Sequence, residues 1–329
     1  MGAVLERDQW GLILAGGEGV RLRTLTRAIA GEERPKQFCA PLGGETLLEQ
    51  TRRRAALVIP PARTFVTLTR RHERFYRALL AGMPRHCAVI EPESRGTAPS
   101  IRYGLAWIAR HAPTGSVAVF PSDHYVSDGG AFMAHVAAAF RAVRVRPDLL
   151  VLLGVVPRSP ETEYGWIEPG EPIPDTPLRR VKSYREKPDP RRAKVLLEND
   201  CLWNSFVIVG RISTFLAVIC QAVPALDAAF ASVDSALGTP RETAVVRALY
   251  ADLAPLDFSE AVLAARPANL AVLPVAGVQW SDWGEPRRVM ATLAALGITP
   301  EWLGRYTSRT VNPRWQPTCA EPPRGRNTG

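Results

Sequence analysis

Short apolar segments alternate with longer amphipathic segments along the first half of the chain. The apolar segments, rich in Val, Ile, Leu or Phe, predict β-strands at residues 10–15, 64–69, 87–91, 117–121 and 149–156. Between them, apolar residues recur at helical spacing and predict helices at 46–58, 73–80, 98–110 and 131–143. This alternation is typical of β–α units joined by right-handed crossovers. We therefore expect an α/β fold with a mainly parallel sheet and helices on both faces.

The pattern changes after Pro157, where loops containing Pro and Gly separate the apolar segments. Strands are predicted at 178–183, 202–209 and 270–274, and helices at 191–198, 212–222, 241–250 and 286–296. We expect a mixed second half built onto the same sheet, so that residues 1–290 form one domain and 291–306 a helical extension. Residues 307–329 contain four prolines among polar residues, which predicts an extended or disordered tail.

Composition and charge exclude several classes of protein. No apolar run is long enough to span a bilayer, and the first nine residues lack an apolar signal core, so we expect a cytoplasmic protein without a membrane partner. The five cysteines are scattered and never form a Cys-x-x-Cys pair, which argues against a disulfide framework or a zinc site. The net charge of +9 is spread along the chain, so it favours anionic small substrates over nucleic acid.

Three glycines mark the first candidate site. Gly16, Gly17 and Gly19 directly follow the first predicted strand, where glycine lets backbone amides turn toward an anion. The alternative is a tight turn without a ligand. The spacing fits neither a dinucleotide fingerprint, since Leu22 stands three residues after Gly19, nor a P-loop, since the chain has no Gly-Lys pair. A different kind of phosphate loop is required.

Several ordered motifs then suggest a family. They read LAGGEGVRL at 14–22, RPKQF at 34–38, EPESRGTAP at 91–99, FPSDH at 120–124, YGWIE at 164–168, REKP at 185–188 and WNS at 203–205. Together they resemble the motifs of the sugar-1-phosphate nucleotidyltransferases, and within that family those of the mannose-1-phosphate guanylyltransferases. The resemblance covers residues 10 to about 290. It implies the nucleotide-diphospho-sugar transferase fold, which has a Rossmann-like mixed sheet.

Several positions depart from the family pattern. Val20 stands where the family has Thr, and the stretch after Leu22 begins Arg23-Thr24 instead of Trp-Pro. Phe206 replaces the Gly that commonly follows Trp-Asn-Ser, and Trp283 replaces the Val of a late Asp-Val-Gly motif. These departures affect the identity of the substrates more than the class of reaction.

The resemblance implies guanylyl transfer from GTP to α-D-mannose 1-phosphate, with Mg²⁺ and with diphosphate as the second product. Such transfers depend on positioning and charge neutralisation, which makes Arg21, Lys36 and Asp123 the candidate catalytic residues. Arg21 offers a fork of donors suited to the departing diphosphate, and the resemblance places Lys36 at the α-phosphate. Asp123 follows a predicted strand and should emerge at its C-terminal edge. The resemblance supplies Asp282 as the second metal ligand.

The remaining candidate residues contact the two substrates. Glu91 could accept hydrogen bonds from the N–H and NH₂ groups of guanine, with a structural carboxylate as the alternative. Glu186 and Asn204 would bind sugar hydroxyls, Gly165 would leave room for the ring, and Lys187 would hold the sugar phosphate. The full expected nucleotide-binding set is Leu14, Ala15, Gly16, Gly17, Gly19, Arg21, Lys36, Glu91, Thr97 and Asp123.

Other functions stay open at this point. The chain could use glucose or heptose 1-phosphate with another nucleotide, or it could be a catalytically silent nucleotide-sensing subunit. The chain has Arg21, Lys36, Asp123 and Asp282 together, which argues against a catalytically silent subunit. Too few residues follow position 290 for a sizeable second catalytic domain, so we expect a monofunctional enzyme. The sequence is also compatible with a homodimer.

Overall fold

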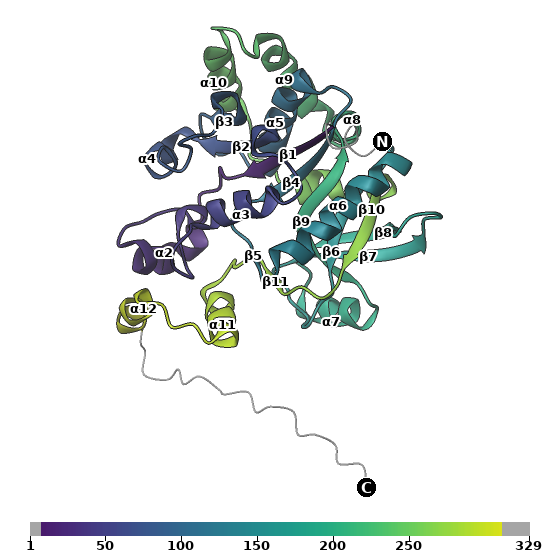
Figure 1. Cartoon of the computed structure of the whole chain (residues 1–329). Helices are drawn as coiled ribbons and strands as arrows, with labels where there is room; N and C mark the ends of the chain where they lie inside the picture. Colours follow the sequence, from purple (N-terminus) through teal and green to yellow (C-terminus); the bar gives the residue numbers. More distant parts are fainter. Residues whose placement is uncertain (1–7, 311–329) are drawn as a thin grey trace.

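The computed structural model describes residues 8–310, which build an α/β fold around one large sheet (Figure 1). Its nine strands pair in the order β3-β2-β1-β4-β9-β6-β10-β8-β7. The parallel part contains β1 (Gln9–Leu14), β2 (Thr64–Thr69), β3 (Ala88–Glu91) and β4 (Ser116–Pro121). Next to β4, β9 (Leu202–Arg211) runs antiparallel and connects it to β6 (Leu150–Val155).

The far side of the sheet is mixed. There β10 (Leu270–Val275) lies parallel to β6, and the antiparallel hairpin of β7 (Gly165–Pro172) and β8 (Arg179–Glu186) forms the edge. A separate antiparallel pair joins β5 (Tyr125–Val126) to β11 (Trp280–Ser281). Within the nine-stranded sheet, β8 and β9 run against the common direction of the other strands, so the prediction of a mainly parallel mixed sheet is confirmed.

Helices cover both faces of the sheet (Figure 1). One face packs against α3 (Leu47–Ala55), α6 (Gly129–Val145) and α7 (Pro190–Glu198), the other against α5 (Thr97–His111), α8 (Ile212–Ala222), α9 (Pro224–Ala236) and α10 (Glu242–Asp252). Because side chains alternate along a strand, Ile13 of β1 points to the first face and Leu12 to the second, and both are fully buried. This alternation divides the apolar core into two layers.

A third, smaller core joins the two ends of the described chain. It forms between α2 (Arg23–Ala30), α11 (Pro286–Leu296) and α12 (Trp302–Thr310), which lie together in Figure 1. Trp302 is buried there, and its indole Nε1 donates to the carbonyl of Pro41 at 2.9 Å. The end of the described chain therefore packs against the helix that follows the glycine loop.

Several elements differ from the sequence predictions. The helix predicted at 73–80 ends early as α4 (Glu73–Tyr76), because the following residues form tighter turns. No prediction covered α2, α9 or β7. The sequence predicts an extended or disordered tail from residue 307, but residues 307–310 are helical. They form the end of α12, which packs against α2 and continues to Thr310. Residues 311–329 lie outside the described part.

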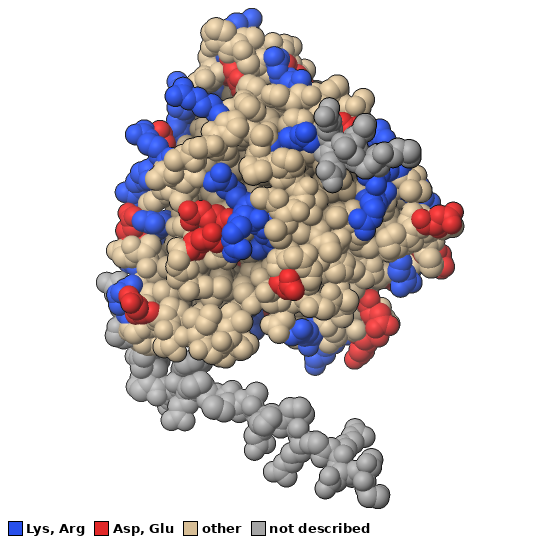
Figure 2. Space-filling model, viewed as in Figure 1, with Lys and Arg blue, Asp and Glu red and all other residues tan. Residues whose placement is uncertain are grey.

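Charged side chains of both signs are interspersed on the face shown in Figure 2. On the face shown in Figure 2, Lys and Arg side chains lie in small groups separated by other residues, several of them beside Asp or Glu. Within residues 8–310, no helix is both long and apolar enough to cross a membrane. Cys39, Cys87 and Cys201 are buried thiols, whereas Cys220 is exposed.

Candidate active site

A cavity of about 360 Å³ lies where β1 and β4 end, next to the glycine loop. Its wall combines segments from distant parts of the chain. The predicted site residues that line it are Leu14, Gly16, Gly17, Arg21, Thr97, Asp123, Gly165, Glu186, Lys187, Asn204 and Asp282. Ala15, Gly19, Lys36 and Glu91 do not line it.

The glycine loop is held by its carbonyl groups. The amide Nε2 of Gln37 donates to the carbonyls of Ala15 and Gly17 at 2.9 and 2.8 Å, and Thr69 Oγ1 donates to that of Gly16 at 2.7 Å. In the described part of the chain, no acceptor takes a hydrogen bond from the amides of Gly16 or Gly17. Backbone amides that have no protein acceptor at the end of a strand are suited to bind phosphate oxygens.

Glu91 lies beneath this loop, not in the cavity. A Cβ atom added to Gly16 would lie only 2.8 Å from Glu91 Oε2. Ser100 Oγ donates to Oε2 at 2.6 Å and the Tyr250 hydroxyl to Oε1 at 2.8 Å, so both carboxylate oxygens have protein partners. Burial raises the pKa of Glu91 to about 7, against the effect of these two hydrogen bonds. This placement does not support the base-reading role and matches the structural alternative.

Lys36 also stands behind the cavity wall. Its Nζ lies 3.0 Å from Asp123 Oδ2 and donates to the carbonyls of Asp282 and Trp283, the latter at 3.1 Å. These contacts account for all three hydrogens of the ammonium, and the side chain is 8% exposed. In this arrangement Lys36 orients Asp123 and the 282–283 backbone instead of facing an α-phosphate.

Asp123 and Asp282 line the same cavity because β5 and β11 pair, which sets Tyr125 opposite Ser281. Burial acts to raise the pKa of Asp123, but the nearby charges, that of Lys36 above all, and the hydrogen bond from Lys36 together hold that pKa below its usual value. Asp282 Oδ1 accepts hydrogen bonds from Arg288 Nη1 at 2.6 Å and from the Gly284 amide at 2.7 Å. Both carboxylates are therefore fixed by protein groups on one side.

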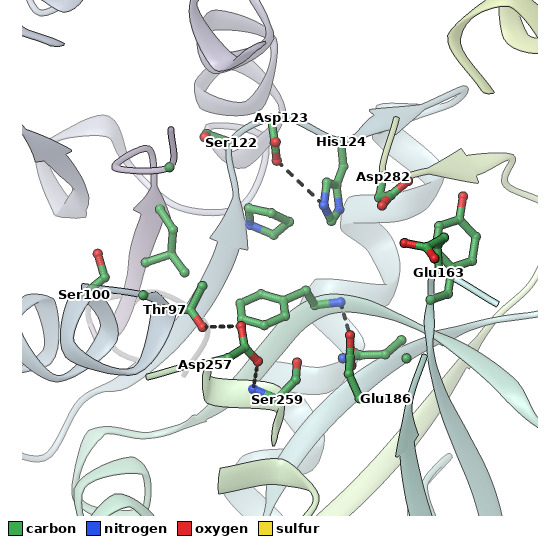
Figure 3. A pocket seen from close by; sticks show the side chains of 18 of the residues that line it. Thr97, Ser100, Ser122, Asp123, His124, Glu163, Glu186, Asp257, Ser259 and Asp282 are labelled. Carbon is green, nitrogen blue, oxygen red and sulfur yellow. Dashed lines mark hydrogen bonds and ion pairs between the residues drawn. The ribbon is translucent and has the colours of Figure 1, made fainter. Parts of the chain in front are cut away.

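His124 lies between the two aspartates (Figure 3). Burial lowers its pKa to about 4, so the imidazole is neutral at physiological pH. Its Nε2 lies 3.7 Å from Asp123 Oδ1, beyond hydrogen-bonding distance. A partly exposed neutral ring between two carboxylates shapes the space around them without adding charge.

Arg21 is an exposed cation at the cavity. Its Nη1 lies 3.3 Å from Glu163 Oε2, and the two side chains are 55% and 36% exposed. Exposed ion pairs of this kind are weak, so little free energy holds Arg21 in this position. The guanidinium can leave Glu163 for a stronger anion that enters the cavity.

A hydrogen-bonded chain forms the opposite wall. Asn204 Nδ2 donates to the Tyr184 hydroxyl at 3.0 Å, which donates to Glu186 Oε2 at 2.7 Å. Burial raises the pKa of Glu186 despite the Tyr184 hydrogen bond and the nearby Lys187. A Cβ atom on Gly165 would overlap the Tyr184 hydroxyl, so glycine is required there by this packing as well as by any substrate.

Sequence reasoning missed several cavity residues. Asp257 accepts hydrogen bonds from Thr97 Oγ1 at 3.1 Å and from the Ser259 amide at 2.8 Å (Figure 3). Asp257 and Ser259 lie just before and within a short π-helix, Ser259–Leu263, and the only local signal was an Asp two residues before a Ser. Others include Glu163, Tyr184 and Phe206, and Arg288 lies directly behind Asp282.

Comparison with known proteins agrees with this geometry. Residues 10–290 match the family described as Nucleotidyl transferase. The chain is 31% identical over 278 residues to the xanthan biosynthesis protein XanB of Xanthomonas campestris, and 30% over 287 residues to a mannose-1-phosphate guanylyltransferase of Sinorhizobium fredii. Each match covers 83% of this chain but only 57% and 52% of the relative, so the chain spans a little over half of their length.

Solved structures give the same result. A crystal structure from Thermus thermophilus, titled mannose-1-phosphate geranyltransferase, is 30% identical and superposes with a TM-score of 0.74. The match covers 86% of this chain and 79% of that one. The motifs, the mixed sheet and the family match thus agree over the same residues. The chain belongs to the nucleotidyl transferase family, among the sugar-1-phosphate nucleotidyltransferases that its motifs resemble.

Proposed function

We propose that the protein transfers a guanylyl group from GTP to α-D-mannose 1-phosphate and releases GDP-mannose and diphosphate. One observation carries the proposal. A single cavity joins the unpaired amides of the glycine loop, the Asp123–Asp282 pair and the polar wall of Glu186 and Asn204. Relatives that carry the name mannose-1-phosphate guanylyltransferase support the choice of substrates.

The two aspartates fit a magnesium ion. Asp123 Oδ1 and Asp282 Oδ2 accept no hydrogen bond from the described residues, so each carboxylate keeps an oxygen for a cation. Residues 8–310 hold no group of three or more His, Cys, Asp or Glu side chains arranged to bind a metal ion, but Mg²⁺ needs only one or two carboxylates beside phosphate oxygens. When bound, Mg²⁺ would neutralise phosphate charge.

The protein groups would divide the remaining work. A phosphate oxygen of the sugar attacks the α-phosphorus of GTP in line, and diphosphate leaves. The amides of Gly16 and Gly17 bind the triphosphate, and Arg21 exchanges Glu163 for the departing diphosphate. Lys36 keeps Asp123 ionised and fixed in position. Preorganised charge of this kind lowers the barrier without a covalent intermediate.

The substrate panel is the direct test. Purified protein with Mg²⁺ is assayed for diphosphate release with GTP, ATP, UTP and dTTP against mannose, glucose and heptose 1-phosphates. We expect the highest kcat/KM with GTP and mannose 1-phosphate. Turnover confined to UTP or dTTP with glucose 1-phosphate would assign a sister activity instead. GTP binding without diphosphate release from any pair would favour a nucleotide-sensing subunit.

A matched pair of variants locates the centre in the same assay. Asp123→Asn keeps the shape of the side chain but removes the charge, so kcat should fall by a factor on the order of 10² or more. Asp148→Asn removes an exposed carboxylate that pairs with Arg146, and it should leave kcat unchanged.

A further inference from the structure

Strand β9 is interrupted where it passes the cavity. Leu152 of β6 pairs with Ile208 and Gly154 pairs with Asn204, so one residue of β6 lies opposite three residues of β9. Polar side chains replace the lost ladder: Asn204 Oδ1 accepts from the Phe206 amide at 3.0 Å, and Ser205 Oγ accepts from the Val207 amide at 3.2 Å. Bulges beside active sites often redirect a side chain. The side chain redirected here belongs to Phe206.

The backbone of Phe206 adopts an unfavourable conformation. Its φ of 59° lies in the left-handed region, which bulky residues rarely occupy and which glycine adopts without strain. Five residues other than glycine have positive φ in the described chain, and two of them, Lys187 and Phe206, line the cavity. Strain held at a site in this way is a reason to look for a functional role.

Phe206 lines the same cavity as the polar wall of Tyr184, Glu186 and Asn204. Phe206 packs against the same core layer as Ile208 and α5, and Thr97 and Ser100 of α5 line the nucleotide side. Two residues before it, Asn204 belongs to the polar wall with Tyr184. An apolar ring next to polar groups suits the C–H face of a sugar whose hydroxyls those groups bind.

We propose that Phe206 is a specificity-determining residue for the sugar 1-phosphate, because its ring closes the wall of the acceptor subsite that a glycine would leave open. The ring packs on one face of the hexose and excludes acceptors with larger substituents. This inference rests on the proposed function for the identity of the acceptor. It does not depend on which nucleotide is used.

The test compares Phe206→Gly with the unchanged protein. Isothermal titration calorimetry gives Kd for mannose 1-phosphate and for GTP, and steady-state kinetics gives the two KM values. We expect Phe206→Gly to raise Kd and KM for mannose 1-phosphate about tenfold, with both GTP constants unchanged within about twofold. Relative to mannose 1-phosphate, kcat/KM for the bulkier N-acetylglucosamine 1-phosphate should rise at least about tenfold.

Two further variants keep the result interpretable. Asp175→Gly relieves a similar φ of 58° in the exposed β7–β8 turn, and it should change none of these constants. Phe206→Leu retains an apolar side chain and should give an intermediate shift, which covers the case in which the glycine variant does not fold. A change in the GTP constants alone, or no change in any constant for either Phe206 variant, would overturn the proposal.

The calorimetry also separates this inference from the proposed function. If the unchanged protein binds mannose 1-phosphate but turns over no pair, the enzymatic proposal fails while the binding shift still tests Phe206. If it binds none of the sugar 1-phosphates, the role of Phe206 fails as well.

Discussion

Two titratable residues, Lys36 and Glu91, lie directly behind the residues that line the cavity. Lys36 binds Asp123 and two backbone carbonyls, and Glu91 lies under Gly16 with Ser100 and Tyr250 as partners. Neither is free to touch a substrate in this arrangement. Both instead determine where the groups that do line the cavity are placed.

Glu91 should make stability depend on pH. Its pKa rises from 4.5 to about 7 on folding, so the folded protein binds more protons than the unfolded chain between these values. The stabilising contribution is complete below pH 4.5, and about 3 kcal/mol of it is lost by the time the pH has passed 7. In Glu91→Gln the side chain does not titrate, so it stays neutral at every pH. In urea unfolding from pH 5 to 8, its free energy of unfolding should fall less steeply than that of the unchanged protein.

The exposed Glu198→Gln serves as the matched control for that series, and its profile should follow the unchanged protein. Parallel profiles for Glu91→Gln and the unchanged protein would mean that Glu91 is ionised in the folded state.

The motifs predicted which residues gather at the site but not which of them face the cavity. Sequence order places Glu91 and Lys36 inside family motifs, but their orientation depends on distant partners. Tyr250 stands 159 positions from Glu91, and the Asp282 carbonyl stands 246 positions from Lys36. No local sequence pattern indicates such distant contacts, so the orientation of these two side chains could not be predicted.

At the scale of elements, α5 connects the nucleotide side of the cavity to the outer helices. It begins at Thr97, next to the glycine loop, and carries the buried Arg102 one turn later. Arg102 forms a bidentate pair with Asp234 at 3.0 and 2.6 Å and a further hydrogen bond with Asp227 at 2.9 Å, both on α9. These bonds fix α9 against α5.

Arg102→Met should therefore lower the free energy of unfolding by about 2 kcal/mol, because it leaves two partly exposed carboxylates without their donor. Arg146→Met removes a similar pair with the exposed Asp148 and should cost less than about 1 kcal/mol. Urea unfolding of both variants measures the difference. Equal costs would show that the α5–α9 pair adds nothing beyond a surface contact.

Elements with a strong local pattern were predicted well, and those that depend on context were not. The strand at 64–69 and the helices at 212–222 and 286–296 match the structure to the residue. The β7 strand contains two prolines and two glycines, so its own residues give little strand signal, and it forms because β8 and β9 pair with it. The short helix α2 likewise depends on its packing in the third core, because its own sequence gives little helix signal.

At the scale of the whole molecule, the third core couples the end of the described chain to the glycine loop. Trp302→Ala would empty a buried position between α12 and α2, and it should lower the free energy of unfolding by about 3–5 kcal/mol. Because α2 follows the glycine loop, the GTP affinity of the folded variant should fall as well. Urea unfolding and GTP titration measure the two effects, with the exposed Glu301→Ala as control. An unchanged GTP affinity would limit α12 to a structural role.

The contacts of Lys36 also have a consequence for synthesis of the protein on the ribosome. The glycine loop, Lys36 and Asp123 are synthesised before the carbonyls of Asp282 and Trp283, which accept the remaining hydrogen bonds of Lys36 and follow Asp123 by about 160 residues. A nascent chain can therefore form most of its sheet while the contacts that fix Asp123 are still incomplete. The cavity is complete only after residues 282 and 283 have left the ribosome.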